Sequence, residues 1–133
     1  NDKDIVINFN TEEVHYVNSD TEQLNRVFIN LLKNSIESLK EKHQKTGDFK
    51  KKIDVEIQLI NDYINIVVED NGTGFTNNDL KTLSKPYFTT KKEGSGLGLS
   101  IVEKILNDHN GFIEFISQKE GAKIKILLPK YVN

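Results

Sequence analysis

The sequence predicts an α+β domain in which helices cover one face of a mixed, mostly antiparallel sheet. Along the 133 residues the predicted order is strands, a long helix, a strand pair, a stretch without periodicity, a second helix and a last strand pair. Both strand pairs alternate apolar and polar residues across a short turn, which is typical of antiparallel hairpins. Each element has one apolar face, so helices and sheet can bury these faces against each other in two layers.

The N-terminal part is predicted to hold two short strands, at 5–9 and 14–17, and then the long helix. Ser19 and Glu22 have the spacing of a capping box, which marks the start of this helix. Gly47 marks its end. The apolar residues that recur at helical spacing between these signals are Leu24, Val27, Phe28, Leu31, Leu32, Ile36 and Leu39.

The central part is predicted to be a hairpin of strands 52–60 and 63–70, with the turn residues Asn61 and Asp62 between them. A glycine-rich loop and a short helix at 77–83 follow.

Residues 85–98 show no periodicity and are expected to form a flexible segment. A second helix is predicted at 99–109, because the pair Asn110-Gly111 is a good helix stop. Strands 112–117 and 122–128 close the chain as another hairpin.

Composition restricts the classes of protein. The chain is 36% hydrophobic and 29% charged with a net charge of −2, which is typical of one globular domain and gives no footprint for nucleic acid. It has no cysteine, so disulfides and thiolate metal sites are excluded. It also has no methionine, so we expect it to be a piece of a longer protein.

Three polar residues recur on one side of the long helix. Asn30, Asn34 and Glu37 fall within about 60° of one another, opposite the apolar stripe. They could be an ordinary solvated face. However, asparagine in a helix interior costs roughly 0.5 kcal/mol relative to alanine, and an amide oxygen suits a Mg²⁺ that also shares phosphate oxygens.

The sequence EDNGTGF places a carboxylate and two glycines at a strand end. Asp70 ends the predicted strand, Gly72 and Gly74 allow a tight turn, and Phe75 offers an apolar wall. Such loops are common in any protein. A fixed carboxylate can also accept a hydrogen bond from an exocyclic amine, which suits adenine and repels the oxygen of guanine.

The sequence PYFTTKKEGSGLGLSI leads into the second helix. Helix N-termini bind phosphate, glycines allow close backbone approach, and Lys91 and Lys92 could fold over a phosphate chain. Leu99 occupies the position of the third glycine of the dinucleotide fingerprint, and no P-loop is present.

These four clusters, in this order, resemble the catalytic ATP-binding domain of sensor histidine kinases, most closely the nitrogen-regulation type. NLLKNSIES resembles the N box, EDNGTGF and GSGLGLSI the two glycine boxes, and PYFTTK the aromatic box of the ATP lid. The resemblance implies the Bergerat α/β sandwich, with a flexible ATP lid at about 76–98, and a single domain over 1–133.

The resemblance also implies site residues. Asn30 and Asn34 would act in catalysis, and Asn34 would hold Mg²⁺. The implied ATP-binding residues are Asn30, Asn34, Asp70, Gly72, Gly74, Phe75, Thr89, Thr90, Lys91, Gly94, Ser95, Gly96, Leu97, Gly98 and Leu99.

The implied function is to bind Mg-ATP and pass its γ-phosphoryl group to a histidine on an upstream dimerisation domain, and thence to a response regulator. None of His15, His43 and His109 has the acceptor context of the family, so the chain is not expected to phosphorylate itself. The parent protein is expected to be a homodimer, with this domain in the cytoplasm, free or as part of a membrane-anchored sensor. An ATPase of the same fold, a serine kinase of the anti-sigma type and a non-catalytic binding module with a vestigial pocket remain alternatives.

Overall fold

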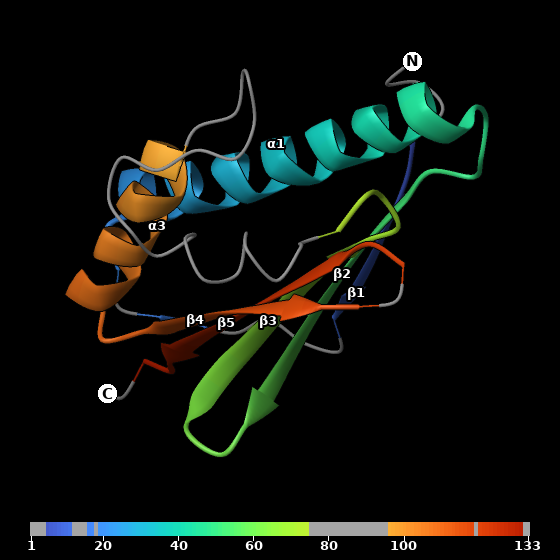
Figure 1. Cartoon of the computed structure of the whole chain (residues 1–133). Coiled ribbons are helices and arrows are strands. Elements are labelled where there is room, and N and C mark those ends of the chain that lie inside the picture. Colours follow the sequence, from blue (N-terminus) through green and yellow to red (C-terminus); the bar gives the residue numbers. More distant parts are fainter. Residues whose placement is uncertain (1–4, 12–15, 18, 75–95, 119, 132–133) are drawn as a thin grey trace.

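The computed structural model describes residues 5–11, 16–17, 19–74, 96–118 and 120–131, with only the backbone of 96–100 and 117. Two helices lie on one face of a five-stranded sheet (Figure 1). The elements are β1 (Val6–Thr11), α1 (Thr21–Thr46), β2 (Lys52–Ile60), β3 (Tyr63–Asp70), α3 (Gly96–Asp108), β4 (Phe112–Ser117) and β5 (Ala122–Pro129).

The sheet has the strand order β1-β2-β3-β5-β4. β1 pairs with β2 in parallel, whereas the other three pairings are antiparallel. The predicted α+β class, with a mixed and mostly antiparallel sheet under helices on one face, is therefore confirmed. β3 lies at the centre of the sheet, so the residues at its end are flanked by the backbones of β2 and β5.

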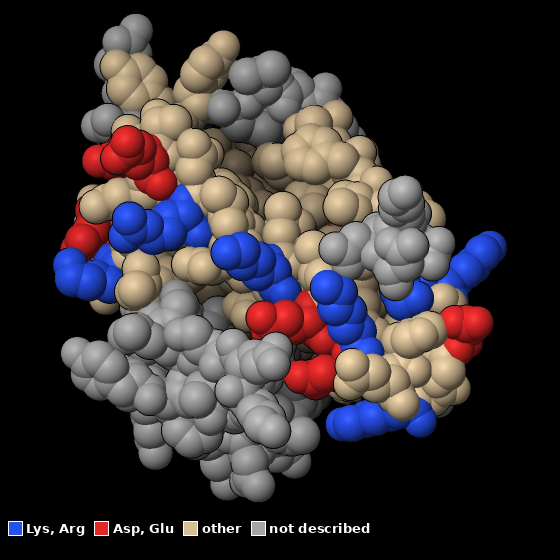
Figure 2. All heavy atoms as spheres, turned by 90° about the horizontal axis from the view of Figure 1, so that it is seen from above, with Lys and Arg blue, Asp and Glu red and all other residues tan. Residues whose placement is uncertain are grey.

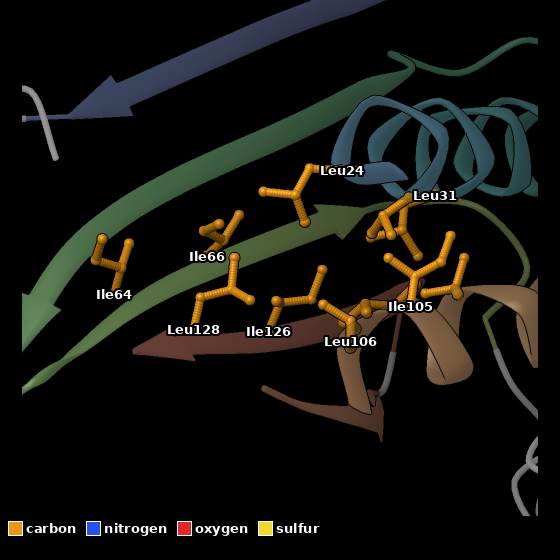
Figure 3. Packing of buried hydrophobic residues seen from close by; sticks show 11 residues of the cluster. Leu24, Leu31, Ile64, Ile66, Ile105, Leu106, Ile126 and Leu128 are labelled. Atoms are coloured by element: carbon orange, nitrogen blue, oxygen red, sulfur yellow. The ribbon is translucent and has the colours of Figure 1, made fainter. Parts of the chain in front are cut away.

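The main core lies between the helices and strands β3 and β5. Leu24 and Leu31 of α1 and Ile105 and Leu106 of α3 point toward the sheet in Figure 3. They meet a row of strand residues, Ile64, Ile66, Ile124, Ile126 and Leu128. A second cluster of Leu39, Ile53 and Val68 continues the core under the later turns of α1. The predicted apolar stripe thus packs as one continuous seam, and it fixes which edge of α1 faces the end of β3.

Helix α1 begins one residue later than the predicted capping box. The N-cap is Asp20 rather than Ser19, and its side chain accepts a hydrogen bond from the backbone N–H of Gln23 at 3.1 Å. Gly47 ends the helix as predicted, with φ +85°.

Helix α3 ends in a Schellman arrangement. Asn110 has φ +58°, and the N–H of Gly111 donates to the carbonyl of Leu106 at 2.7 Å. The helix begins at Gly96, three residues before the predicted start, so residues 96–98 belong to the helix and not to the flexible segment.

Two further predictions have different outcomes. Tyr16 and Val17 are not in a strand, so the strand predicted at 14–17 is wrong for its described half. The carbonyl of Tyr16 accepts one hydrogen bond from the N–H of Tyr131, which is not a ladder. The short helix predicted at 77–83 lies outside the described residues.

His109 joins the end of α3 to the start of α1. Its Nε2 atom accepts a hydrogen bond from the N–H of Asp20 at 3.0 Å, and its Nδ1 atom lies 2.8 Å from the carbonyl of Ile105. These partners require the neutral ring with its proton on Nδ1. The N-cap of α1 is therefore held by a residue 89 positions away.

Figure 2 shows the face that carries α1, where acidic and basic side chains are interspersed among uncharged ones. Neither of the two described helices is long and apolar enough to cross a membrane.

Candidate functional site

The candidate site is centred on Asp70, the last residue of β3. Its side chain is 5% exposed. Ile53 of β2 and Ala122 of β5 are its partners in the sheet register, and α1 covers it from above. The central strand therefore delivers a carboxylate to a place where water has little access.

The Asp70 carboxylate is surrounded by hydroxyl and amide donors. Its Oδ1 atom accepts from the N–H of Gly72 at 2.9 Å and from the hydroxyl of Ser38 at 3.3 Å. Burial raises the pKa of Asp70, and hydrogen bonds from Gly72, Ser35, Ser38 and the Ala122 backbone oppose this rise. A buried acceptor of this kind suits a ligand that donates a hydrogen bond.

The loop after Asp70 is fastened to α1 through Ser38. The N–H of Thr73 donates to the Ser38 hydroxyl oxygen at 2.9 Å, and the Thr73 hydroxyl lies 3.2 Å from the same atom. The N–H of Thr73 also lies 3.3 Å from the Ser38 carbonyl. One serine therefore connects the carboxylate and the loop to the same turn of helix.

The two predicted loop glycines have distinct roles. A Cβ atom on Gly72 would lie 2.6 Å from the carbonyl carbon of Ser38, so only glycine lets the loop pass this close to α1. Gly74 has φ +79° and faces the carbonyl of Gly121 in the turn between β4 and β5. Both glycines therefore shape the loop through close backbone contact.

Asn71 clamps the other side of the same loop. Its amide nitrogen donates to the Lys50 carbonyl at 2.6 Å, and its amide oxygen accepts from the N–H of Lys52 at 2.8 Å. Lys42 of α1 donates to the Asn71 carbonyl at 2.9 Å. With Ser38 on one side and Asn71 on the other, the loop is bonded to both layers of the domain.

Asn34 lies one turn and Asn30 two turns before Ser38 along the same edge of α1. Both are half-buried, as is Glu37, so the predicted position opposite the apolar stripe is wrong: they border the buried face. The described residues contain no cluster of three or more His, Cys, Asp and Glu side chains that could hold a metal ion. The oxygen of a half-buried amide is a ligand type that fits Mg²⁺, which binds few protein ligands and keeps its waters.

The second glycine box is only partly described. Gly96, Leu97, Gly98 and Leu99 form the first turn of α3, where backbone N–H groups have no helical partner. Several predicted site residues lie outside the described residues: Phe75, Thr89, Thr90, Lys91, Gly94 and Ser95.

Sequence reasoning gave no role to three residues around Asp70: Ser35, Ser38 and Gly121. The two serines are buried within the stripe of α1, at 3% and 5% exposure. A buried hydroxyl needs a partner, so a serine on an apolar stripe was the available signal. Gly121 acts through the backbone, and its sequence carries no such signal.

Comparisons with known proteins agree with this geometry. The family model of histidine kinase-, DNA gyrase B- and HSP90-like ATPases matches residues 19–132. A Rickettsia conorii protein named as an NtrY-like sensor histidine kinase is 37% identical over 118 residues, which are 88% of this chain and 18% of the relative. Sporulation kinase A of Bacillus subtilis is 35% identical over 116 residues, which are 86% of this chain and 18% of that kinase.

A solved structure of the catalytic domain of histidine kinase ThkA, in a nucleotide-free form, has the same fold. Its TM-score is 0.80 at 30% identity, and the match covers 97% of this chain and 81% of that one. By contrast, this chain spans 18% of the length of each of the two bacterial relatives.

Proposed function

Because the chain belongs to the family of histidine kinase-, DNA gyrase B- and HSP90-like ATPases, we propose that it binds Mg-ATP and donates the γ-phosphoryl group to a histidine of a sensor kinase. The resemblance to histidine kinase catalytic domains of the nitrogen-regulation type, predicted from the four motifs, is confirmed by the family match, the NtrY-like relative and the ThkA fold.

The observation that carries the proposal is the buried environment of Asp70, in which no residue that the structure describes forms an ion pair with the carboxylate. Its described partners are hydroxyl and backbone N–H groups, and none of them carries a charge. An ionised carboxylate can only accept hydrogen bonds. It would accept from the exocyclic amine of adenine, while the carbonyl oxygen at the same edge of guanine would be repelled.

The phosphates would lie between α1 and the start of α3. The first turn of α3 offers backbone N–H groups and the positive end of a helix dipole, and its glycines allow close approach. Asn34 would hold Mg²⁺ through its amide oxygen. When bound, Mg²⁺ neutralises phosphate charge during phosphoryl transfer.

Asn30 favours transfer to a protein over hydrolysis. An ATPase of this fold needs a carboxylate base at this position of the helix to deprotonate water, and an amide has no such basicity at neutral pH. The γ-phosphoryl group is therefore expected to stay on ATP until an imidazole nitrogen attacks it, with ADP as the leaving group.

The acceptor histidine would lie on an upstream dimerisation domain of the parent protein, which would be a homodimer and would signal to a response regulator. None of the chain's own histidines has the sequence context of that acceptor. Since the domain must reach cellular ATP, the proposal also places it in the cytoplasm.

The test joins the chain to its upstream histidine-bearing segment and incubates it with γ-labelled ATP and Mg²⁺. Acid-labile label on histidine is expected in the longer protein, and negligible phosphate release from the 133-residue chain alone. Rapid multiple-turnover hydrolysis of ATP by the chain, with no label on the longer protein, would contradict the kinase assignment and identify the protein as an ATPase.

A further inference from the structure

We propose that Ser38 is a positioning residue that keeps the Asp70 carboxylate ionised and aimed at the base, and so sets the preference of the site for adenine over guanine. The inference rests on the proposed nucleotide site and adds a determinant of its specificity. Ser38 lies on α1, 32 residues before Asp70.

The hydrogen-bond pattern fixes the direction of the Ser38 proton. A hydroxyl has one proton and two lone pairs, and the ionised Asp70 carboxylate is acceptor-only. The Thr73 N–H, at 2.9 Å, must also donate to the Ser38 oxygen. The Thr73 hydroxyl oxygen, at 3.2 Å, and Asp70 Oδ1, at 3.3 Å, compete for the single Ser38 proton, and the ionised carboxylate is the stronger acceptor of the two.

The remaining lone pair of Ser38 serves the same loop. The Thr73 hydroxyl lies 3.2 Å from the Ser38 oxygen and 3.4 Å from the Glu41 carboxylate, and the Gly74 N–H lies 3.5 Å from the Ser38 oxygen. Ser38 is thus the point where the carboxylate and three groups of the loop converge. Loss of its hydroxyl would remove the link that runs through α1 and leave only the bond from the Gly72 N–H to join the loop to the carboxylate.

Packing leaves Ser38 little freedom to turn away. A Cβ atom on Gly72 would lie 2.3 Å from the Ser38 oxygen, so the Gly72 backbone lies directly against this hydroxyl. The Ser38 side chain is 5% exposed, so bulk water has little access to its hydroxyl. Its orientation is therefore set by the protein before any ligand arrives.

Charged groups near Asp70 act on its loop. On α1, Glu41 contacts the Thr73 hydroxyl and Lys42 the Asn71 carbonyl. On β2 and β5 the residues paired with Asp70 are the uncharged Ile53 and Ala122. The charge state of Asp70 therefore depends on burial and on neutral donors, of which Ser38 is one.

The link to specificity follows from the two protonation states of Asp70. Ionised, it accepts from the adenine amine and repels the guanine oxygen; protonated, its O–H can donate to that oxygen. Burial favours the protonated form, and the Ser38 hydroxyl opposes it. Ser38 is therefore expected to hold the site in its adenine-selective state at neutral pH.

The test compares Ser38→Ala with Thr46→Ala, which removes a hydroxyl from the exposed end of the same helix, where it bonds to the Lys42 carbonyl. Carbon-detected NMR of the Asp70 carboxyl gives its titration midpoint without nucleotide. Calorimetry gives the ratio of ATP to GTP affinity from pH 5 to 8. For Ser38→Ala we expect a higher titration midpoint of Asp70 and a preference for ATP over GTP that is lowered about 5- to 10-fold at neutral pH. As the pH is lowered, the variant should lose this preference at a higher pH than the parent protein does.

Each outcome of this comparison either supports or overturns the proposed role of Ser38. An unchanged Asp70 midpoint and unchanged nucleotide ratio in Ser38→Ala would overturn the inference while leaving ATP binding intact. An equal fall in Thr46→Ala would also overturn it, because the effect would then be a general one of the helix. If the parent chain binds neither nucleotide, the proposed function fails, and the Asp70 titration still decides whether Ser38 controls that carboxylate.

Discussion

Replacing Gly72 by alanine should separate the loop of the candidate site from helix α1. The new Cβ atom would lie 2.6 Å from the carbonyl carbon and 2.7 Å from the carbonyl oxygen of Ser38. These are backbone atoms of a helix that is packed over the core, so the loop must retreat. Ordinary contact begins near 3.4 Å, which requires a shift of about 0.8 Å.

This shift exceeds the tolerance of the bonds that fasten the loop. The Thr73 N–H bond to the Ser38 hydroxyl would lengthen from 2.9 Å to about 3.7 Å, which is no longer a hydrogen bond. Overpacking costs about 1–3 kcal/mol, and one or two lost hydrogen bonds add about 1 kcal/mol each. We expect a loss of about 2–5 kcal/mol, or roughly 7–18 °C in Tm for a domain of 133 residues.

Thermal denaturation followed by circular dichroism measures the stability, and calorimetry with ATP measures the site. Gly47→Ala is the matched control, since Gly47 has φ +85° and no atom within 4 Å of the added carbon. It should lose about 1–3 kcal/mol through backbone strain alone and keep the parent's ATP affinity, whereas Gly72→Ala should lose both. A Gly72→Ala variant with the parent's Tm and ATP affinity would refute the close-packing argument.

Four further outcomes are expected. Asp70→Asn should weaken ATP binding by about 1.5–3 kcal/mol in calorimetry; undiminished binding would remove Asp70 from the adenine site. Because burial raises the pKa of Asp70, the folded state retains its proton longer than the unfolded state. Parent stability in urea should therefore fall, relative to Asp70→Asn, as the pH rises from about 4 through the raised pKa; parallel curves would contradict this. Asn34→Ala should lose the Mg²⁺ dependence of ATP binding while its circular dichroism spectrum is unchanged, and equal EDTA sensitivity in both proteins would exclude the metal role. His109→Phe removes the bonds to Asp20 and Ile105 and should cost about 1–2 kcal/mol in urea denaturation without changing ATP affinity.

Predictions from local patterns succeeded where the local pattern decides the structure. The apolar stripe of α1, the two hairpins and the stops at Gly47 and Gly111 depend on neighbours in sequence, and the structure contains them. The choice of Asp20 over Ser19 as N-cap could not be read in this way. Both can cap a helix, but the N–H of Asp20 is also held by His109 at the end of α3.

The start of α3 shows a second limit. Glycine disfavours helix, so residues 96–98 were assigned to the flexible segment, yet the helix begins at Gly96. The strand predicted at 14–17 had the right alternation but no ladder partner at its described residues.

Those parts of the candidate site that lie within one local sequence motif could be predicted, and the parts that depend on tertiary packing could not. Asp70 and Gly72 stand in one short motif, and both lie where that motif implied. Ser38 belongs to the site only because the end of β3 passes beneath that turn of α1, which is a tertiary fact. A buried serine in a helix is otherwise an ordinary small residue.

β1 is an edge strand that reaches its partner only across a long connection. The β2–β3 hairpin closes across two residues, whereas β1 reaches its partner only after residues 12–51, including all of α1, have been laid down. The entropy of closing a loop grows with its length, and parallel pairing forms slowly. All six residues of β1 are also exposed, so few buried contacts retain it. The parallel edge of the sheet should therefore open first, and its amide protons should exchange ahead of those in β3.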